Sequence, residues 1–411
     1  MIELNEIEER VILVGVQQAD GDDTEESVKE LGELAKTAGA QVVGSVIQNR
    51  ERIHPGTYIG KGKLDEVRMM LWETDATGII CDDELSPAQL NNLQSELDCK
   101  VCDRTLLILD IFARHAVTSE GKLQVELAQL RYRAARLTGL GNSLSRLGGG
   151  IGTRGPGEKK LEMDRRLIRT RISHLKQELE EVIRHRELIR AGRKKSEQKI
   201  AALVGYTSVG KSAIFKRMTG ADVLEDAKLF ATLDTTTRGI CLSGKQEVLL
   251  TDTVGFIRKL PHHLVEAFKS TLEEVCCADI LIHVVDASNP QMEVQMGVVY
   301  ETLHQLGADD HPVITVFNKQ DLLAEPKSFR DHHAELCVAA SAHTGQGMEE
   351  IKAGIEQILR SQKIYIERLY SYDQAGLIQI IRRKGELLSE EYQAEGIFVK
   401  AYVTKDIYMK V

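Results

Sequence analysis

The sequence lacks any hydrophobic run long enough to cross a membrane, and its first residues are acidic, unlike the basic start of a secretory signal. It also lacks a cysteine framework, because its seven cysteines occur at irregular spacing in 411 residues. Such usage is typical of a reducing compartment and excludes the disulfide-rich secreted class. We therefore expect a cytoplasmic protein with no membrane insertion.

A zinc-binding pattern is missing as well. Cys99 and Cys102 form a lone C-x-x-C, and no second pair of Cys or His follows at zinc spacing. Buried strand cysteines explain this pair better than a metal or redox role. The chain is long enough for about two to four domains with sizeable cores.

Positive charge is concentrated in one segment, from Lys122 to Lys199. This segment holds 20 Lys and Arg against 9 Asp and Glu, a local balance of +11, although the whole chain carries −9. A basic segment within an otherwise acidic protein favours a polyanionic partner for that segment. The alternative is a solvated helical face, which the nine acidic residues keep open.

The most informative motif, G-x-x-x-x-G-K-S, follows the apolar run Ile200–Val204. At a strand-to-helix turn this spacing is typical of a phosphate-binding loop, whose backbone N–H groups and helix N-terminus attract phosphate. We expect Lys211 to reach the β- and γ-phosphates and the Ser212 hydroxyl to ligate Mg²⁺. The loop comprises Gly205, Tyr206, Thr207, Ser208, Val209, Gly210, Lys211 and Ser212.

A second motif closes the apolar run Val248–Leu250. A carboxylate there can hold Mg²⁺ through water, and the Gly255 N–H can sense the γ-phosphate. The residues are Asp252, Thr253, Val254 and Gly255.

Two further motifs indicate which base the bound nucleotide carries. Asp321 would accept hydrogen bonds from the N1–H and amine of guanine, a donor pair that adenine lacks. Ser341 and Ala342 follow Leu336–Ala340 and could offer a backbone N–H to guanine O6. The first of these motifs, after Val313–Phe317, comprises Asn318, Lys319, Gln320 and Asp321. In this order the elements indicate a GTPase that takes GTP to GDP.

The N-terminal region alternates predicted strands with helices, which indicates a small α/β domain with a largely parallel sheet. Within it, Gly56–Lys63 is glycine-rich but is not a Walker sequence. Lys61 and Lys63 could contact phosphate there, or the segment could form a turn, and the local chemistry favours the turn. The predicted strands are Val11–Val16, Ala40–Ile47, Thr77–Cys81 and Cys99–Asp103, with helices at Asp23–Thr37 and Ser86–Leu97.

Two helical patterns bracket a glycine-rich segment. Leu123, Leu127, Leu130 and Ala134 recur at helical steps, and helical spacing resumes over Glu158–Ile189. The six glycines and one proline of residues 148–157 fit neither helix nor sheet. We therefore predict an antiparallel helical hairpin with a mobile tip. Basic residues near this tip suit irregular RNA, with a flexible linker as the alternative; the predicted RNA contacts are Arg146, Arg154, Lys159 and Lys160.

These features predict an α/β protein of four parts. Residues 1–120 would form an N-terminal α/β domain, and residues 121–197 the basic hairpin with its glycine-rich loop. Residues 198–361 would form a P-loop GTPase domain with a mainly parallel sheet. Residues 362–411 would form a small α+β domain.

The chain resembles the HflX-type GTPases, within the Obg–HflX branch of translation-associated GTPases. The resemblance implies a cytoplasmic protein that binds the large ribosomal subunit near the peptidyl-transferase region. We expect this protein to be a monomer. The resemblance also implies use of GTP to dissociate or rescue ribosomes. Besides the GTPase motifs, it rests on Thr57–Lys63, Asp103–Thr105, Leu109–Phe112, Arg114–Ala116, Gln124–Leu130 and Gly148–Glu158.

The resemblance also implies a switch segment. By this match Thr232 would be the second hydroxyl ligand of Mg²⁺, ordered when a γ-phosphate is present, and Lys211, Thr232 and Gly255 would form the catalytic set. Thr235 stands where family members commonly carry proline, and the residues alone do not separate Thr232 from the neighbouring threonines. The segment comprises Phe230, Ala231, Thr232, Leu233 and Asp234.

Phe256 stands where Ras-like enzymes place a water-orienting glutamine. Phenylalanine cannot hydrogen-bond water, which predicts slow intrinsic hydrolysis and a partner that completes the site. The alternative is a core phenylalanine with no catalytic meaning. Two other functions stay open: a nucleotide-gated factor that binds ribosomal RNA during assembly, and a signalling switch, against which the basic loop weighs.

Overall fold

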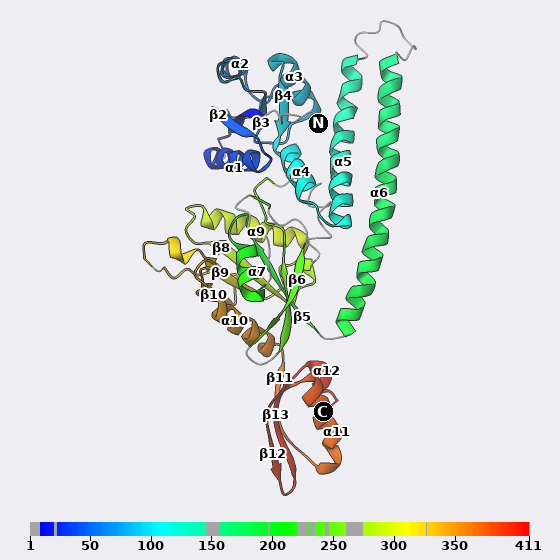
Figure 1. Cartoon of the computed structure of the whole chain (residues 1–411), viewed down its shortest axis with the longest axis vertical. Coiled ribbons are helices and arrows are strands. Elements are labelled where there is room, and N and C mark those ends of the chain that lie inside the picture. Colours follow the sequence, from blue (N-terminus) through cyan, green and yellow to red (C-terminus); the bar gives the residue numbers. More distant parts are fainter. Residues whose placement is uncertain are drawn as a thin grey trace, which may run out of the picture.

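The computed structural model describes residues 9–19, 23–144, 156–195, 198–220, 229–230, 235–242, 246–259, 274–325 and 327–410. Of these, residues 138–144, 156–161, 185–195, 384 and 405–406 are described by their backbone alone. Figure 1 shows an N-terminal α/β domain beside a long helical hairpin, a larger α/β domain in the middle, and a small domain at the far end. The predicted fold class is confirmed. Within the described ranges, no helix is long and apolar enough to span a membrane.

The N-terminal domain is a four-stranded parallel sheet in the order β2-β1-β3-β4. Alternate residues of β1 face opposite layers: Leu13 packs in one core cluster and Ile12 in another, so helices cover both faces. The strands are β1 Arg10–Gln17, β2 Gln41–Asn49, β3 Gly78–Cys81 and β4 Lys100–Asp103. The helices are α1 Thr24–Thr37, α2 Lys61–Thr74, α3 Pro87–Leu97 and α4 Arg104–His115.

The turn predicted for Gly56–Lys63 is wrong at its C-terminal end. Helix α2 begins at Lys61, so Lys61 and Lys63 lie in its first turn. The tight backbone ends at Gly60, whose N–H donates to the Gln48 Oε1 atom at 2.9 Å.

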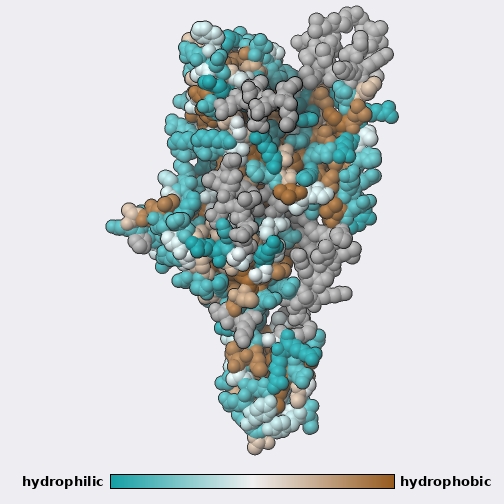
Figure 2. Space-filling view, viewed as in Figure 1, coloured by the Kyte–Doolittle hydropathy of each residue, from teal (hydrophilic) through white to brown (hydrophobic). Residues whose placement is uncertain are grey.

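The hairpin consists of α5 Ser119–Leu144 and α6 Pro156–Lys195, which lie side by side (Figure 1). Asp103 anchors it to the N-terminal domain, because its carboxylate accepts hydrogen bonds from Tyr132 Oη and Arg136 Nη2, each at 2.7 Å. Figure 2 shows hydrophobic side chains gathered along the hairpin, and Met163 and Leu167 of α6 are among the exposed ones.

The predicted RNA-binding tip falls largely outside the described residues. Arg146, Arg154 and most of the glycine-rich loop belong to residues 145–155, which the structure does not describe. Lys159 and Lys160 lie in the first turns of α6.

The middle domain is a six-stranded sheet in the order β10-β9-β8-β5-β7-β6. All neighbours are parallel except β6, which pairs antiparallel with β7. The carboxyl ends of the parallel strands meet at one edge, where ligands bind in such sheets. The strands are β5 Lys199–Gly205, β6 Thr236–Cys241, β7 Glu247–Asp252, β8 Ile280–Asp286, β9 Val313–Asn318 and β10 Leu336–Ala339. Around them lie α7 Lys211–Thr219, α9 Met292–Leu306, α10 Met348–Ser361 and the short turn η2 Gln320–Leu322.

The small C-terminal domain is an antiparallel sheet in the order β11-β13-β12 with helix α11 on one face. Alternate residues of β13, such as Val399 and Ala401, are buried with Ile378 and Ile381 of α11. The strands are β11 Ile364–Tyr370, β12 Glu386–Gln393 and β13 Gly396–Val403. The other elements are η3 Tyr372–Gln374, α11 Ala375–Lys384 and α12 Lys405–Tyr408.

Candidate nucleotide-binding site

The glycine-rich loop lies between β5 and α7, and its shape depends on Gly210. Gly210 has φ of +96°, and a Cβ atom there would lie 2.4 Å from Asn318 Nδ2. Both the backbone angle and this steric clash disfavour any residue other than glycine. Asn318, at the end of β9, donates from that same nitrogen to the Val209 carbonyl at 2.8 Å. The loop and the third predicted motif are therefore held together.

The Lys211 ammonium is buried under the loop. Its Nζ atom donates to the carbonyl oxygens of Gly205 and Tyr206, at 3.1 and 2.6 Å. Burial lowers the pKa of Lys211 to about 8, although the Asp252 carboxylate opposes the shift. An anionic group beside this ammonium would favour its charged form.

Ser212 and Asp252 bring two oxygen atoms together at the start of α7. The Ser212 hydroxyl donates to Asp252 Oδ2 at 2.7 Å, and Asp252 is fully buried at the end of β7. A hydroxyl and a carboxylate are the hard oxygen ligands that Mg²⁺ prefers, so these residues fit a magnesium site. The predicted ligand Thr232 lies outside the described residues, as do Ala231, Leu233 and Asp234.

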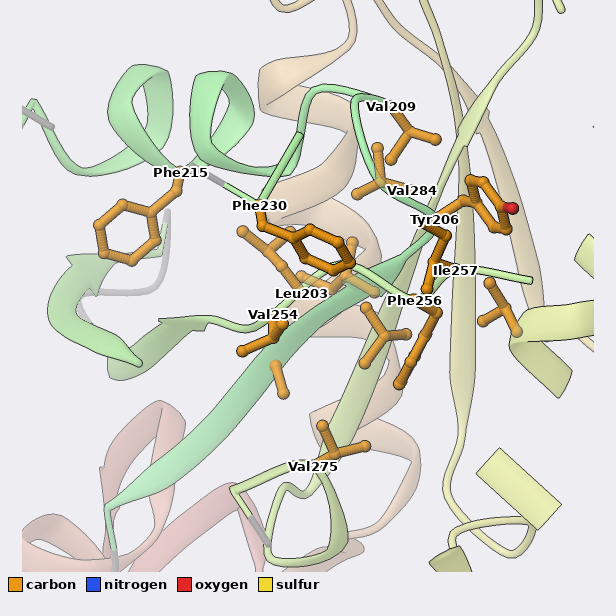
Figure 3. Packing of buried hydrophobic residues seen from close by; sticks show 14 of the residues in the cluster. Leu203, Tyr206, Val209, Phe215, Phe230, Val254, Phe256, Ile257, Val275 and Val284 are labelled. Atoms are coloured by element: carbon orange, nitrogen blue, oxygen red, sulfur yellow. The ribbon is translucent and has the colours of Figure 1, made fainter. Parts of the chain in front are cut away.

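Gly255 lies directly against the phosphate-binding loop. A Cβ atom at this position would lie 2.9 Å from Thr207 Cα and 3.0 Å from Lys211 Nζ, so only glycine fits. The next residue, Phe256, is joined to the loop by two backbone hydrogen bonds, with Gly205 and with Thr207. Its side chain is buried in the core (Figure 3), and it offers no hydrogen bond to a water.

The predicted base-recognition residues lie at the ends of β9 and β10. The Ser341 hydroxyl donates to Asp321 Oδ1 at 2.5 Å, and the Ala342 N–H donates to Asn318 Oδ1 at 2.9 Å. Lys319 Nζ pairs with Asp286 Oδ2 of β8 at 2.7 Å. The structure therefore places the phosphate loop, Asp252, Asn318 and Asp321 at one edge of the sheet.

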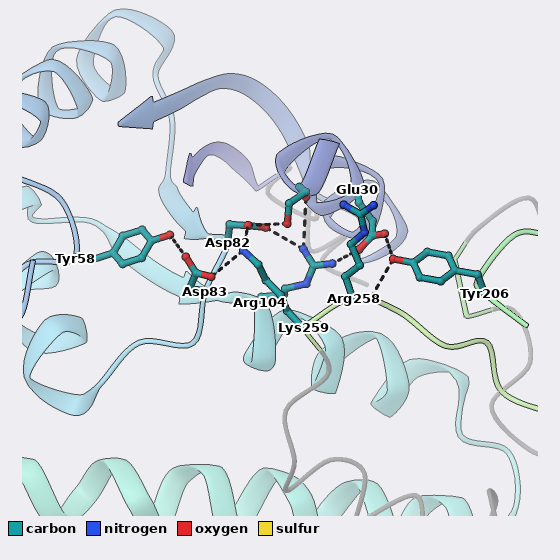
Figure 4. A network of polar contacts seen from close by, with 9 residues as sticks. Glu30, Tyr58, Asp82, Asp83, Arg104, Tyr206, Arg258 and Lys259 are labelled. Carbon is teal, nitrogen blue, oxygen red and sulfur yellow. Dashed lines mark hydrogen bonds and ion pairs between the residues drawn. The ribbon is translucent and has the colours of Figure 1, made fainter. Parts of the chain in front are cut away.

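Several residues at this site belong to the N-terminal domain (Figure 4). Glu30, Asp82 and Asp83 among them were not predicted from the sequence. Tyr206 Oη of the loop donates to the Glu30 carboxylate and accepts the Arg258 N–H at 2.9 Å. Glu30 also pairs with the fully buried Arg104, whose Nη1 atom lies 2.9 Å from Asp82 Oδ1. A continuous polar network thus reaches from α1, α4 and Asp82, directly after β3, to the phosphate-binding loop.

The segment after Gly255 joins the same network. Lys259 Nζ lies 2.6 Å from Asp82 Oδ2 and 2.8 Å from Asp83 Oδ1, and Tyr58 Oη donates to Asp83 at 2.6 Å. Lys259 adopts the left-handed region, with φ of +53°, which is uncommon for a residue with a side chain.

The switch segment meets the N-terminal domain at Phe230, the only one of its five predicted residues that the structure describes. The Phe230 ring packs edge-to-face on Phe112 of α4, with ring centroids 4.6 Å apart. Its side chain therefore faces the N-terminal domain. Thr57–Lys63 and Asp103–Thr105, on which the family resemblance partly rests, contain Tyr58 and Arg104 of this network, but no spacing in the sequence identifies their partners.

Comparison with protein families identifies three consecutive regions. Residues 25–113 match the family described as GTP-binding GTPase N-terminal, and residues 115–193 match GTP-binding GTPase Middle Region. Residues 200–319 match the family described as 50S ribosome-binding GTPase.

Relatives match along nearly the whole chain. GTPase HflX of Lacrimispora saccharolytica is 64% identical over 408 residues, covering 99% of this chain and 96% of the relative. GTPase HflX of Escherichia coli is 41% identical over 392 residues, covering 95% and 89%. A GDP complex of a GTP-binding protein from Sulfolobus solfataricus is similar at 23% identity and a TM-score of 0.45, covering 85% of this chain and 98% of that one. The chain is a GTP hydrolase that belongs to the HflX family of GTPases.

Proposed function

We propose that this edge of the sheet binds GTP and GDP together with Mg²⁺. Lys211 contacts the β- and γ-phosphates, and Ser212 and Thr232 supply hydroxyl ligands for the metal, which would neutralise charge that develops on the phosphates. Gly255 presents its N–H to the γ-phosphate. Gly255 lies so close to Thr207 and Lys211 that a Cβ atom would not fit between them, and this close approach is the observation that supports the arrangement. It brings the two phosphate-sensing segments together.

In this proposal Asp321 recognises the guanine base. Replacing Asp321 by asparagine should weaken GDP binding by about 10- to 100-fold, the effect of leaving buried donors unpaired. It should also shift preference toward xanthine, because an amide can donate to the xanthine 2-oxo group. Titration of fluorescent GDP and XDP measures both. Full guanine preference in the variant would show that Asp321 does not read the base.

We further propose that the protein acts in the cytoplasm on the ribosome, with GTP driving subunit dissociation or rescue. The local charge of +11 between residues 122 and 199 supports a nucleic-acid partner for the hairpin. Figure 1 supports it too. The C-terminal end of α5 and the N-terminal end of α6 lie together, far from β5 and α7, which border the phosphate-binding loop. The hairpin tip, with Arg146, Arg154, Lys159 and Lys160, would lie near the peptidyl-transferase region of the large subunit.

Sucrose-gradient profiles of intact ribosomes test this function. With GTP the protein should convert ribosomes to subunits, and with GDP it should not. Replacing Arg146 and Arg154 by alanine should abolish the conversion. It should also lower the log–log salt slope of ribosome binding by about 2, because each arginine would neutralise one phosphate.

The matched control removes Arg383 of α11 and Lys410, two exposed positive charges of the C-terminal domain, and should leave the profile unchanged. Nucleotide affinity should stay normal in both variants. Binding to free subunits with no effect on intact ribosomes would favour the assembly factor instead. Unchanged binding in the Arg146/Arg154 variant would show that the tip is only a linker.

A further inference from the structure

Arg217 joins the two ends of the nucleotide site, although no motif includes it. It lies in the last turn of α7, the helix that begins at Lys211. Its Nε atom donates to the Ala342 carbonyl at 3.0 Å, and its Nη2 atom donates to the His343 carbonyl at 2.7 Å. Both carbonyls belong to the loop after β10, which also contacts Asn318 and Asp321.

These contacts fix the direction of backbone donors in that loop. The Ala342 C=O and the His343 N–H belong to one planar trans peptide and point in opposite directions. A guanidinium that holds the Ala342 oxygen therefore turns the His343 N–H away from α7. The Ala342 N–H is directed toward Asn318.

The chemistry of the arginine suits this task. A guanidinium presents several N–H donors in a rigid fork, so one side chain can hold two neighbouring carbonyls at once. Hydrogen bonds from a charged donor are stronger than neutral ones. A lysine at the same place would donate as a point charge on a flexible stem and would fix the peptide less well.

We propose that Arg217 is a positioning residue for guanine recognition: it orients the peptide between Ala342 and His343 so that the His343 N–H is presented to guanine O6. The proposal rests on the assignment of Asp321 and this loop to the base. Because Arg217 shares α7 with Lys211 and Ser212, it also fixes the base-reading loop relative to the phosphate site.

The test compares three nucleotides that differ at single groups. 6-Thio-GDP replaces O6 by sulfur, a poorer acceptor, and keeps N1–H and the amine. IDP keeps O6 and lacks the amine that Asp321 reads. In the Arg217→Ala protein, GDP affinity should fall about 3- to 10-fold, the value of one hydrogen bond. The preference for GDP over 6-thio-GDP should shrink toward 1, while the preference for GDP over IDP stays as in the unmodified protein.

Controls separate positioning from a general structural role. Arg217→Lys should give an intermediate loss, and Arg383→Ala, which removes an exposed arginine of α11, should change nothing. An equal loss for all three nucleotides, or an unchanged ratio of GDP to 6-thio-GDP in both Arg217 variants, would overturn the proposal.

The Asp321→Asn protein shows which assumption is at fault. If that variant turns to xanthine while the Arg217 variants keep the 6-thio-GDP ratio, the base site is correct and Arg217 has no part in it. If Asp321→Asn retains guanine preference, the base assignment itself is wrong and the Arg217 proposal falls with it.

Discussion

Adding ribosomes or large subunits to the purified protein should raise GTP hydrolysis by about 10³- to 10⁵-fold, the scale of a partner-supplied catalytic group. The reason lies at Phe256, which occupies the position after Gly255 and is buried in the core. The Phe256 side chain cannot hydrogen-bond the attacking water and so cannot orient it. The isolated protein should therefore turn over slowly. Phosphate release measured with and without ribosomes gives the ratio.

Ribosome preparations carry other GTPases, so the control is the Lys211→Ala protein with the same ribosomes. Its rate should equal that of ribosomes alone. Comparable rates for the unmodified protein with and without ribosomes would contradict the idea that a partner completes the site.

Replacing Lys211 by alanine should itself lower GTP hydrolysis by at least about 10²- to 10³-fold, the cost of losing one donor to charge that develops in the transition state. The loss should be larger for hydrolysis than for GDP binding, because the ammonium is expected to contact the γ-phosphate as well. Single-turnover hydrolysis and nucleotide titration of the same protein separate the two effects. Equal losses in both would contradict a role in the transition state.

The pH dependence of binding gives an independent check on Lys211. Its pKa is lowered to about 8 by burial in the nucleotide-free protein, and bound phosphate should raise it. The complex then holds more protons than the free protein, so affinity should fall as pH rises above 8. One proton limits the slope to about tenfold per pH unit. GDP titrations from pH 7 to 9.5 should show this fall, and Lys211→Ala should be nearly flat.

The parts of the site that the sequence predicts share one physical basis. Each motif combines a buried strand with a turn at fixed spacing, and parallel strands bring their ends to a common edge. The positions of Lys211, Asp252 and Asn318 follow from that rule. The partners of Arg104 and Arg217 do not, because they lie 22 to 126 residues away in the chain and no local pattern records them.

Strand β12 is an element that the sequence analysis did not predict, and its composition explains why. Its sequence contains Glu386, Glu390 and Glu391, and glutamate is depleted in strands. The strand forms because β13 pairs with it and because nearby basic residues neutralise the charges of its glutamates. Arg382 binds Glu390, and Arg360 and Lys363 bind Glu386. The favourable terms come from other segments, so a reading of the segment alone could not supply them.

The polar network between the N-terminal domain and the phosphate-binding loop has a thermodynamic consequence. Tyr206 lies in the phosphate-binding loop and bonds to Glu30, and Lys259 lies four residues after Gly255 and pairs with Asp82 and Asp83. A ligand that moves Tyr206 or Lys259 therefore changes the free energy needed to separate the N-terminal domain from the GTPase domain. If a partner binds the N-terminal domain and separates it from the GTPase domain, that binding must change the affinity for nucleotide by a certain factor. By thermodynamic reciprocity, bound nucleotide must change the affinity for that partner by the same factor. The effect of nucleotide on partner affinity and the effect of the partner on nucleotide affinity then measure the same coupling free energy.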